Sequence, residues 1–167
     1  MTREDFIACA KAEQKRLRLF LLGLCADPDL ADDLAQDTLM KAYLASEAFV
    51  PRFSFSTWLL KIAYNNFLDY SRLYGVRCRG SLDSLVDRQD NEASADASFR
   101  FQRLYQALDK LTEKERSAVM LFYIYGFSAK EISGIVGESS TTVRKRLQRA
   151  REHLENELIN DENNERQ

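Results

Sequence analysis

Residues 128–154, "SAKEISGIVGESSTTVRKRLQRAREHL", contain apolar and basic residues that recur with a helical period. An α-helix advances about 100° per residue. At that advance, one stripe collects Val143, Leu147, Ala150, Leu154 and Leu158. An apolar stripe of this length must pack against other helices. The segment is therefore expected to be a helix with one buried face.

The opposite side of the same helix is basic and rich in hydroxyl groups. It presents Thr141, Lys145, Gln148 and Arg149, flanked by Thr142, Arg144, Arg146 and Arg151. We expect no acidic side chain to neutralise these bases. Like charges at helical spacing repel each other by roughly a few tenths of a kcal/mol per pair, so a polyanion would stabilise this face. A solvated charged helix is the alternative.

A short helix, a tight turn at "GES" and a second, basic helix form the pattern of a helix-turn-helix, whose second helix enters the major groove of DNA. The segment "SSTT" offers free backbone amides where phosphate can bind, and Lys, Arg and Gln can bond to base edges. We predict that DNA is contacted by Ser140, Thr141, Thr142, Arg144, Lys145, Arg146, Gln148 and Arg149.

Helical spacing continues through the rest of the chain, which has two prolines and six glycines, so we predict an all-α fold. The expected helices cover about 3–25, 29–46, 57–76 and 99–111, and the second has Asp29 as its N-cap. The first buries a stripe of Phe6, Ala10, Leu17, Leu21 and Leu24. Two capping boxes, Thr112 with Glu115 and Ser128 with Glu131, begin two further helices that end at Gly126 and Gly137.

Residues 79–97 lose the helical period and gain Ser, Asp and Asn, which is typical of a linker. We therefore predict two small helical domains, residues 1–78 and 98–167, joined by a flexible linker that lets them move separately.

Composition excludes several classes of function. The 167 residues are 45% hydrophobic and 30% charged, and no segment approaches the roughly 20 apolar residues of a membrane-spanning helix. The N-terminus lacks a secretory signal, so we expect a cytoplasmic protein without membrane insertion. Cys9, Cys25 and Cys78 lack metal-ligand spacing, and the single histidine, His153, lies in an acidic segment. We expect no enzyme activity, no metal and no cofactor.

Two outward faces are expected in the first half. The helix at 57–76 buries one side, made of Leu59, Ile62, Ala63, Phe67, Tyr70, Leu73 and Tyr74. Lys61, Asn65, Leu68 and Arg72 lie opposite, with Trp58 at the border and the aromatic loop "FVPRFSFS" (49–56) before it. Cations, amides and aromatic rings together suit unstacked bases, although a single Trp is more often part of a core. Asn66 lies inside the apolar arc and is expected to be a buried amide with partners.

The second outward face belongs to the helix at 29–46. Its packing side is made of small residues, namely Ala31, Leu34, Ala35, Thr38, Ala42 and Ala45. This leaves Leu39, Met40 and Tyr43 outside with Asp32, Asp33 and Gln36. A surface that mixes acidic and apolar groups indicates a protein interface, with a solvated face as the alternative.

Three segments carry a family resemblance: "DLAQDTLMKAY", "FSTWLLKIAYNNFLDYSR" and "LTEKERSAVMLFYIYGFSAKEISGIVGESSTTVRKRLQRAR". In this order they resemble a bacterial extracytoplasmic-function sigma factor of the sigma-70 family. The second segment is similar to the family pattern F-x-x-W-L-x-x-I-A-x-N-x-x-x-D-x-x-R at Phe55, Trp58, Leu59, Ile62, Ala63, Asn65, Asp69 and Arg72.

The resemblance implies a two-domain initiation factor that joins core RNA polymerase at promoter DNA. The N-terminal domain would melt the minus-ten element through Phe49, Phe53, Phe55, Trp58, Lys61, Asn65 and Arg72, and the C-terminal domain would read the minus-thirty-five element. The coiled coil of the polymerase largest subunit would meet Asp32, Asp33, Gln36, Asp37, Leu39, Met40 and Tyr43, and the flap region is a further expected contact on polymerase. An anti-sigma factor is a further expected partner.

The chain departs from the family at Thr141 and Lys145, where Gly and Ser are common, and at Asp37, where Glu is commoner. These departures suggest an unusual minus-thirty-five sequence and a weaker docking contact. Two other classes stay open. A free-standing helix-turn-helix regulator leaves the faces of the first half unexplained, and a purely helical protein-interaction module would bind no DNA.

Overall fold

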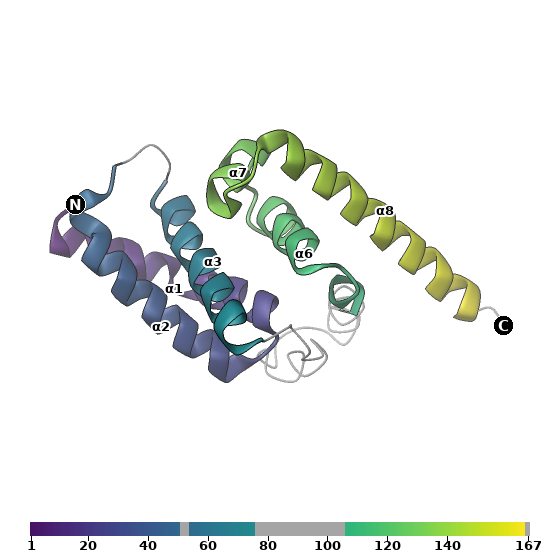
Figure 1. The fold of residues 1–167 in the computed structure, drawn as a ribbon, viewed down its shortest axis with the longest axis horizontal. Helices are drawn as coiled ribbons and strands as arrows, with labels where there is room; N and C mark the ends of the chain where they lie inside the picture. The colour runs from purple at the N-terminus through teal and green to yellow at the C-terminus, as the bar shows by residue number, and fades with distance from the viewer. Residues whose placement is uncertain (51–53, 76–105, 166–167) are drawn as a thin grey trace.

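The computed structural model describes residues 1–50, 54–75 and 106–165, with side chains to residue 157. Within these ranges all regular structure is helical, which confirms the all-α prediction (Figure 1). The elements are α1 (Arg3–Cys25), α2 (Pro28–Ala45), the 3-10 turn η1 (Ser46–Ala48), α3 (Phe55–Tyr74), α6 (Glu113–Val119), the π-helical turn η2 (Met120–Ile124), α7 (Ala129–Val136) and α8 (Ser140–Glu165). The predicted linker and most of the predicted helix at 99–111 lie outside the described residues.

The start of α2 differs from the prediction. Asp27, not Asp29, is the N-cap, and its carboxylate accepts hydrogen bonds from the backbone N–H of Asp29 at 3.0 Å and Leu30 at 3.1 Å. Pro28 fixes this start, because its locked φ and missing N–H suit the first helical position. The prediction of Asp29 as N-cap was therefore wrong by two residues.

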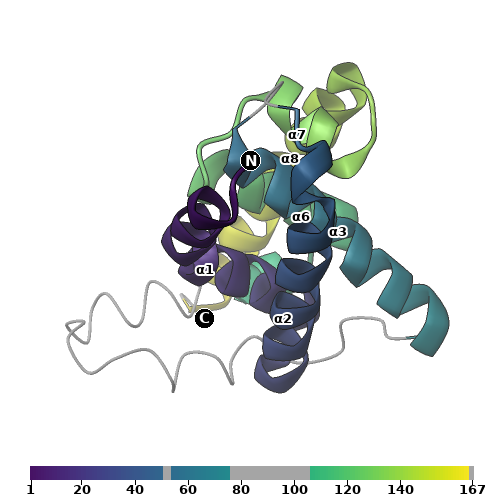
Figure 2. The same ribbon diagram turned by 90° about the vertical axis from the view of Figure 1, so that its left-hand side faces the viewer.

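The first unit is a bundle of α1, α2 and α3 (Figures 1 and 2). The α1 stripe is confirmed, except that Ala10 is half-buried and Phe20 joins the fully buried side chains. The predicted α2 packing side is likewise buried except for Ala45. Leu73 and Tyr74, predicted as core, are 79% and 68% exposed, because the last turn of α3 projects past its neighbours (Figure 2).

Asn66 is the polar centre of this bundle and confirms the predicted buried amide. Its amide nitrogen donates to the Leu34 carbonyl and to Thr38 Oγ1, both at 3.3 Å. Its amide oxygen accepts from Lys41 Nζ at 2.5 Å. Buried amides need such partners, so these contacts fix α2 against α3.

The second unit consists of α6, η2, α7 and α8. Both predicted capping boxes are present, with Thr112 and Glu115 at α6 and Ser128 and Glu131 at α7. Gly126 and Gly137 adopt the left-handed conformation, with φ of 72° at each, and so end the helical runs as predicted.

The two units share one continuous hydrophobic core. Helix α7 packs on α3, and α6 contacts α1. Tyr125 Oη donates to the Arg16 carbonyl at 2.9 Å, and the Phe20 and Tyr125 rings meet edge to face at 6.0 Å. Gly23 of α1 lies against the Met120 side chain, whose flexible end occupies the space that a Cβ would need. The sequence patterns did not predict this contact between the halves.

Candidate nucleic-acid interface

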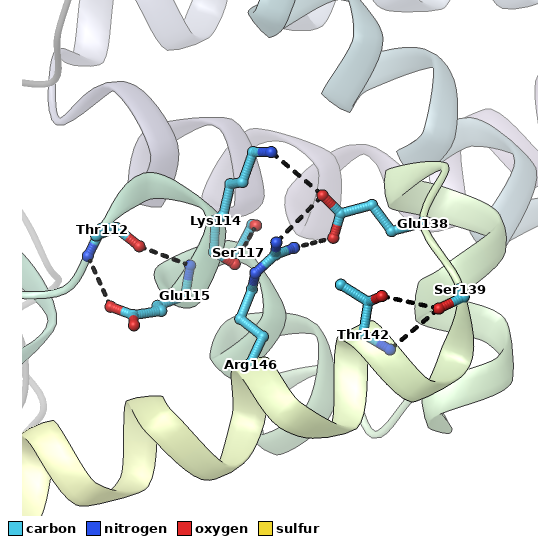
Figure 3. Close-up of polar contacts among 8 residues, drawn as sticks. All are labelled: Thr112, Lys114, Glu115, Ser117, Glu138, Ser139, Thr142 and Arg146. Atoms are coloured by element: carbon cyan, nitrogen blue, oxygen red, sulfur yellow. Dashed lines mark hydrogen bonds and ion pairs between the residues drawn. The ribbon is translucent and has the colours of Figure 1, made fainter.

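The helix-turn-helix consists of α7, the turn at 137–139 and α8. Val143, Leu147 and Ala150 are buried and Leu154 is half-buried, so the predicted α8 stripe is confirmed as far as side chains are described. The Ser139 hydroxyl accepts a hydrogen bond from the Thr142 N–H at 3.1 Å and lies 2.8 Å from Thr142 Oγ1 (Figure 3). This contact caps the start of α8.

The outward face of α8 carries most of the predicted DNA-contacting set. Exposed members are Thr141, Thr142, Arg144, Lys145, Gln148 and Arg149, whereas Ser140 is half-buried. The Gln148 amide donates to the Glu152 carboxylate at 3.2 Å. Arg151, on the flank, stacks over the Tyr123 ring at 5.8 Å. The cationic groups of Arg144, Lys145 and Arg149 thus remain exposed to a polyanion along the first turns of α8.

Arg146 is the exception, and here the expectation that no acid neutralises the basic face was wrong. Both terminal guanidinium nitrogens of Arg146 bond to the Glu138 carboxylate, which also accepts from Lys114 Nζ at 3.2 Å (Figure 3). The hydrogen bond from Arg146 is the main reason that the pKa of Glu138 lies below its usual value. The acid comes from the turn before the helix, so helical spacing did not reveal it.

The outer face of α3 presents the predicted polar groups. Lys61, Asn65 and Arg72 are exposed and Leu68 is half-buried. Arg72 lies 3.8 Å from Asp69, a contact that solvent weakens because both side chains are largely exposed. The predicted arrangement of this face therefore exists in the structure.

Aromatic rings gather where the loop enters α3. Phe49, Phe55 and Trp58 are half-buried, with ring centroids 4.9 to 6.2 Å apart. Phe55 also meets Phe6 of α1 edge to face at 5.8 Å. The cluster packs Phe49 and the start of α3 against the bundle, and each of its three residues stays partly exposed. Phe53 lies outside the described residues.

The outer face of α2 mixes acidic and apolar groups as predicted. Asp33, Gln36, Asp37, Met40 and Tyr43 are exposed and Leu39 is half-buried. Asp32 is less available than expected, because Arg18 holds it with two hydrogen bonds of 2.5 and 3.3 Å.

Some exposed apolar residues were missed. Leu44 is 76% exposed and follows Met40 by four residues, so helical spacing could have placed it on the same face. Tyr123 and Ile124 in η2 are also exposed, and no pattern singled them out.

The described ranges contain neither a cluster of metal ligands nor a membrane-spanning helix. In those ranges, no three His, Cys, Asp or Glu side chains lie close enough together to hold a metal ion. None of the helices described is both long enough and apolar enough to cross a membrane.

The structure packs a helix-turn-helix, whose second helix is basic, on a three-helix unit that has one cationic face and one acidic-apolar face. This combination is typical of a DNA-binding transcription protein with a protein-docking surface. Family models agree with this class. Residues 9–74 match Sigma-70 region 2, and residues 101–154 match Sigma-70, region 4.

Individual proteins also resemble the chain. The ECF RNA polymerase sigma factor EcfG of Rhodopseudomonas palustris (strain TIE-1) is 30% identical over 152 residues, covering 91% of this chain and 82% of that protein. The ECF RNA polymerase sigma factor SigM of Bacillus subtilis (strain 168) is 30% identical over 148 residues, covering 86% and 90%.

Among solved structures, the sigma factor RpoE in its complex with the anti-sigma factor NepR from Bartonella quintana superposes with a TM-score of 0.76 at 28% identity. That match covers 93% of this chain and 98% of RpoE. The chain belongs to the extracytoplasmic-function group of the sigma-70 family and is an RNA polymerase sigma factor.

Proposed function

We propose that the chain directs core RNA polymerase to promoters through three surfaces of different chemistry. Residues 1–78 form a unit that docks on polymerase and melts the minus-ten element. Residues 98–167 form a unit that reads the minus-thirty-five element, and residues 79–97 link the two. The observation that carries the proposal is the exposed basic face on α8, a helix whose other face is buried.

Polymerase docking is assigned to the outer face of α2. Its exposed carboxylates complement the basic coiled coil that the family resemblance implies on the largest subunit. Met40 and Tyr43 add apolar area that water would otherwise cover. The docking set is Asp32, Asp33, Gln36, Asp37, Leu39, Met40 and Tyr43, and the flap region is the expected contact of the second unit.

Minus-ten recognition is assigned to the outer face of α3 and the aromatic cluster beside it. An unstacked base can be held by ring faces and by the amide of Asn65, and the cations of Lys61 and Arg72 favour the phosphate backbone. Phe49, Phe53, Phe55 and Trp58 complete this set.

Minus-thirty-five recognition is assigned to α8. Lys145, Gln148 and Arg149 suit base edges, and Thr141, Thr142 and Arg144 suit phosphates near the helix start. Neither unit is expected to hold a promoter alone, since unstacking a base costs roughly a few kcal/mol and phosphate contacts weaken with salt. Polymerase supplies the rest by presenting both units at high effective concentration.

An anti-sigma factor is the expected inhibitory partner, a proposal supported by the likeness to RpoE in complex with NepR. The chain is proposed to work in the cytoplasm and to have no enzyme activity of its own, since a sigma factor positions the polymerase that performs the chemistry.

The decisive experiment mixes the purified chain with core RNA polymerase and genomic DNA and sequences the starts of the transcripts. The proposal expects starts at a shared promoter sequence that are absent with core polymerase alone. Specific DNA binding by the free chain, together with unchanged transcript starts, would contradict it and favour a free-standing regulator.

A further inference from the structure

Glu138 stands at the point where three elements of the helix-turn-helix unit meet. It lies in the turn after Gly137 and accepts hydrogen bonds from Arg146 of α8 and Lys114 of α6 (Figure 3). The Arg146 contact uses both terminal guanidinium nitrogens. A two-pronged contact fixes the plane of the guanidinium as well as its distance.

Burial separates Arg146 from the other bases of α8. The Arg146 side chain is 18% exposed and that of Glu138 is 23% exposed, whereas Arg144, Lys145 and Arg149 are exposed. Contacts between partly buried charges are screened less by water than surface pairs are. Arg146 is therefore held inside the unit while its neighbours face outward.

We propose that Arg146 is a positioning residue rather than a DNA contact. With Glu138 and Lys114 it sets the angle at which α8 presents Lys145 and Arg149 to the base edges. This inference rests on the proposed reading of promoter DNA by α8, and it removes Arg146 from the contacting set predicted from the sequence.

Charge at the helix start gives a second reason for this role. Glu138 directly precedes the hydroxyl-rich start of α8, where DNA phosphates are expected to approach. If Arg146 turned toward DNA, the Glu138 carboxylate would lose its strongest partner and lie beside phosphates. Retaining Arg146 on Glu138 keeps that acid neutralised beside the helix start.

The test compares Glu138→Gln, Arg146→Lys and the double variant in the full chain, each assembled with core RNA polymerase. Transcription is measured on promoter fragments found by sequencing transcript starts, with the upstream element either intact or randomised. The ratio of the two rates reports discrimination. If the parent assembly starts no specific transcripts, the proposed function itself has failed, so the two failures are distinguishable.

We expect Glu138→Gln and Arg146→Lys each to lower discrimination roughly tenfold. The double variant should be no worse than either single variant, because both changes break one shared contact. Arg146→Lys keeps the positive charge but cannot make the two-pronged contact. Discrimination at the parental level in Glu138→Gln would overturn the proposal. A loss of discrimination confined to Arg146→Lys would also overturn it, because that is the result expected of an arginine that touches DNA.

Glu157→Gln is the matched control. It makes the same carboxylate-to-amide change in the ion pair with Lys110, which lies away from the turn and is more exposed than the Arg146–Glu138 contact, and it should leave discrimination unchanged. Circular dichroism of each free variant checks folding. If Glu138→Gln does not fold, Glu138→Asp takes its place, because the shorter carboxylate keeps the charge but cannot reach Arg146 in the same way, and parental discrimination in that variant overturns the proposal.

Discussion

Asn65 and Asn66 are adjacent in α3 and have opposite surroundings. Asn66 is buried with three partners, so Asn66→Ala should lower the free energy of unfolding by about 2 kcal/mol. Asn65 is exposed, so Asn65→Ala should change it by less than about 0.5 kcal/mol. Urea denaturation of the free chain measures both values, and equal destabilisation by the two substitutions would contradict the assignment.

Asn65→Ala should also impair promoter opening while leaving polymerase binding intact. The reason is that its amide faces the proposed melted strand and lies on a different helix from the docking face. Opening is followed by permanganate reactivity of unpaired thymines, and polymerase binding by co-elution. Equal loss of both would remove the proposed role.

Lys145 and Arg149 share the outward face of α8 and should each matter for the upstream element. Lys145→Ala and Arg149→Ala should each weaken its recognition by about 2 kcal/mol, roughly thirtyfold. Competition between promoter fragments with and without the element, at fixed salt, measures this loss. Lys11→Ala, which removes an exposed charge from α1, is the control and should bind as the parent does.

The surroundings of a residue could be predicted from the sequence where they follow from its own helix. Asn66 was predicted as buried because its neighbours in the helical projection are apolar. The partner of Arg146 was missed, since Glu138 precedes it by eight residues across a turn and no helical period joins them.

Local chemistry fixed the starts of α6 and α7. Both predicted capping boxes formed, because their partners lie three residues apart and need no tertiary contact. The exposure of Leu73 and Tyr74 was not predictable, because periodicity tells which side of a helix is apolar and not how far the neighbouring helices extend.

Helix α2 offers a prediction about assembly. Changing Asp33 and Gln36 together to Lys should block co-elution with core polymerase, because like charges would then face the basic coiled coil. Both side chains are exposed, so the fold should survive, as thermal unfolding would show. Glu155→Lys adds positive charge at an exposed position of α8 and should co-elute normally. Normal co-elution of the α2 variant would exclude this face as the docking surface.

The two halves of the chain share one hydrophobic core, which the sequence patterns did not predict. Leu60 and Tyr64 are both buried, yet neither belongs to the main apolar stripe of α3. They line a second side of the helix, which the second unit covers. The helical spacing of apolar residues identifies the most apolar face of a helix. Whether a second face is also buried depends on a partner more than forty residues away in the sequence.

Tyr64 makes that contact between the units testable by pH. Burial raises the pKa of its phenol above 10.0, the Glu113 carboxylate of α6 adds to the rise, and the Ser117 hydroxyl partly offsets it. Because the unfolded chain ionises this phenol first, its contribution to stability is complete below about pH 10 and is lost as pH rises toward the folded pKa.

The parent should therefore lose stability faster than Tyr64→Phe above pH 10, by at most about 1.4 kcal/mol per pH unit, the slope for one proton. Urea denaturation between pH 8 and pH 11 measures the difference, in which the other titrating groups cancel. Tyr74→Phe, at an exposed position outside the contact, is the control, and its stability should change with pH as that of the parent does. If the stabilities of Tyr64→Phe and the parent fall in parallel with pH, the two units do not bury this phenol between them in solution.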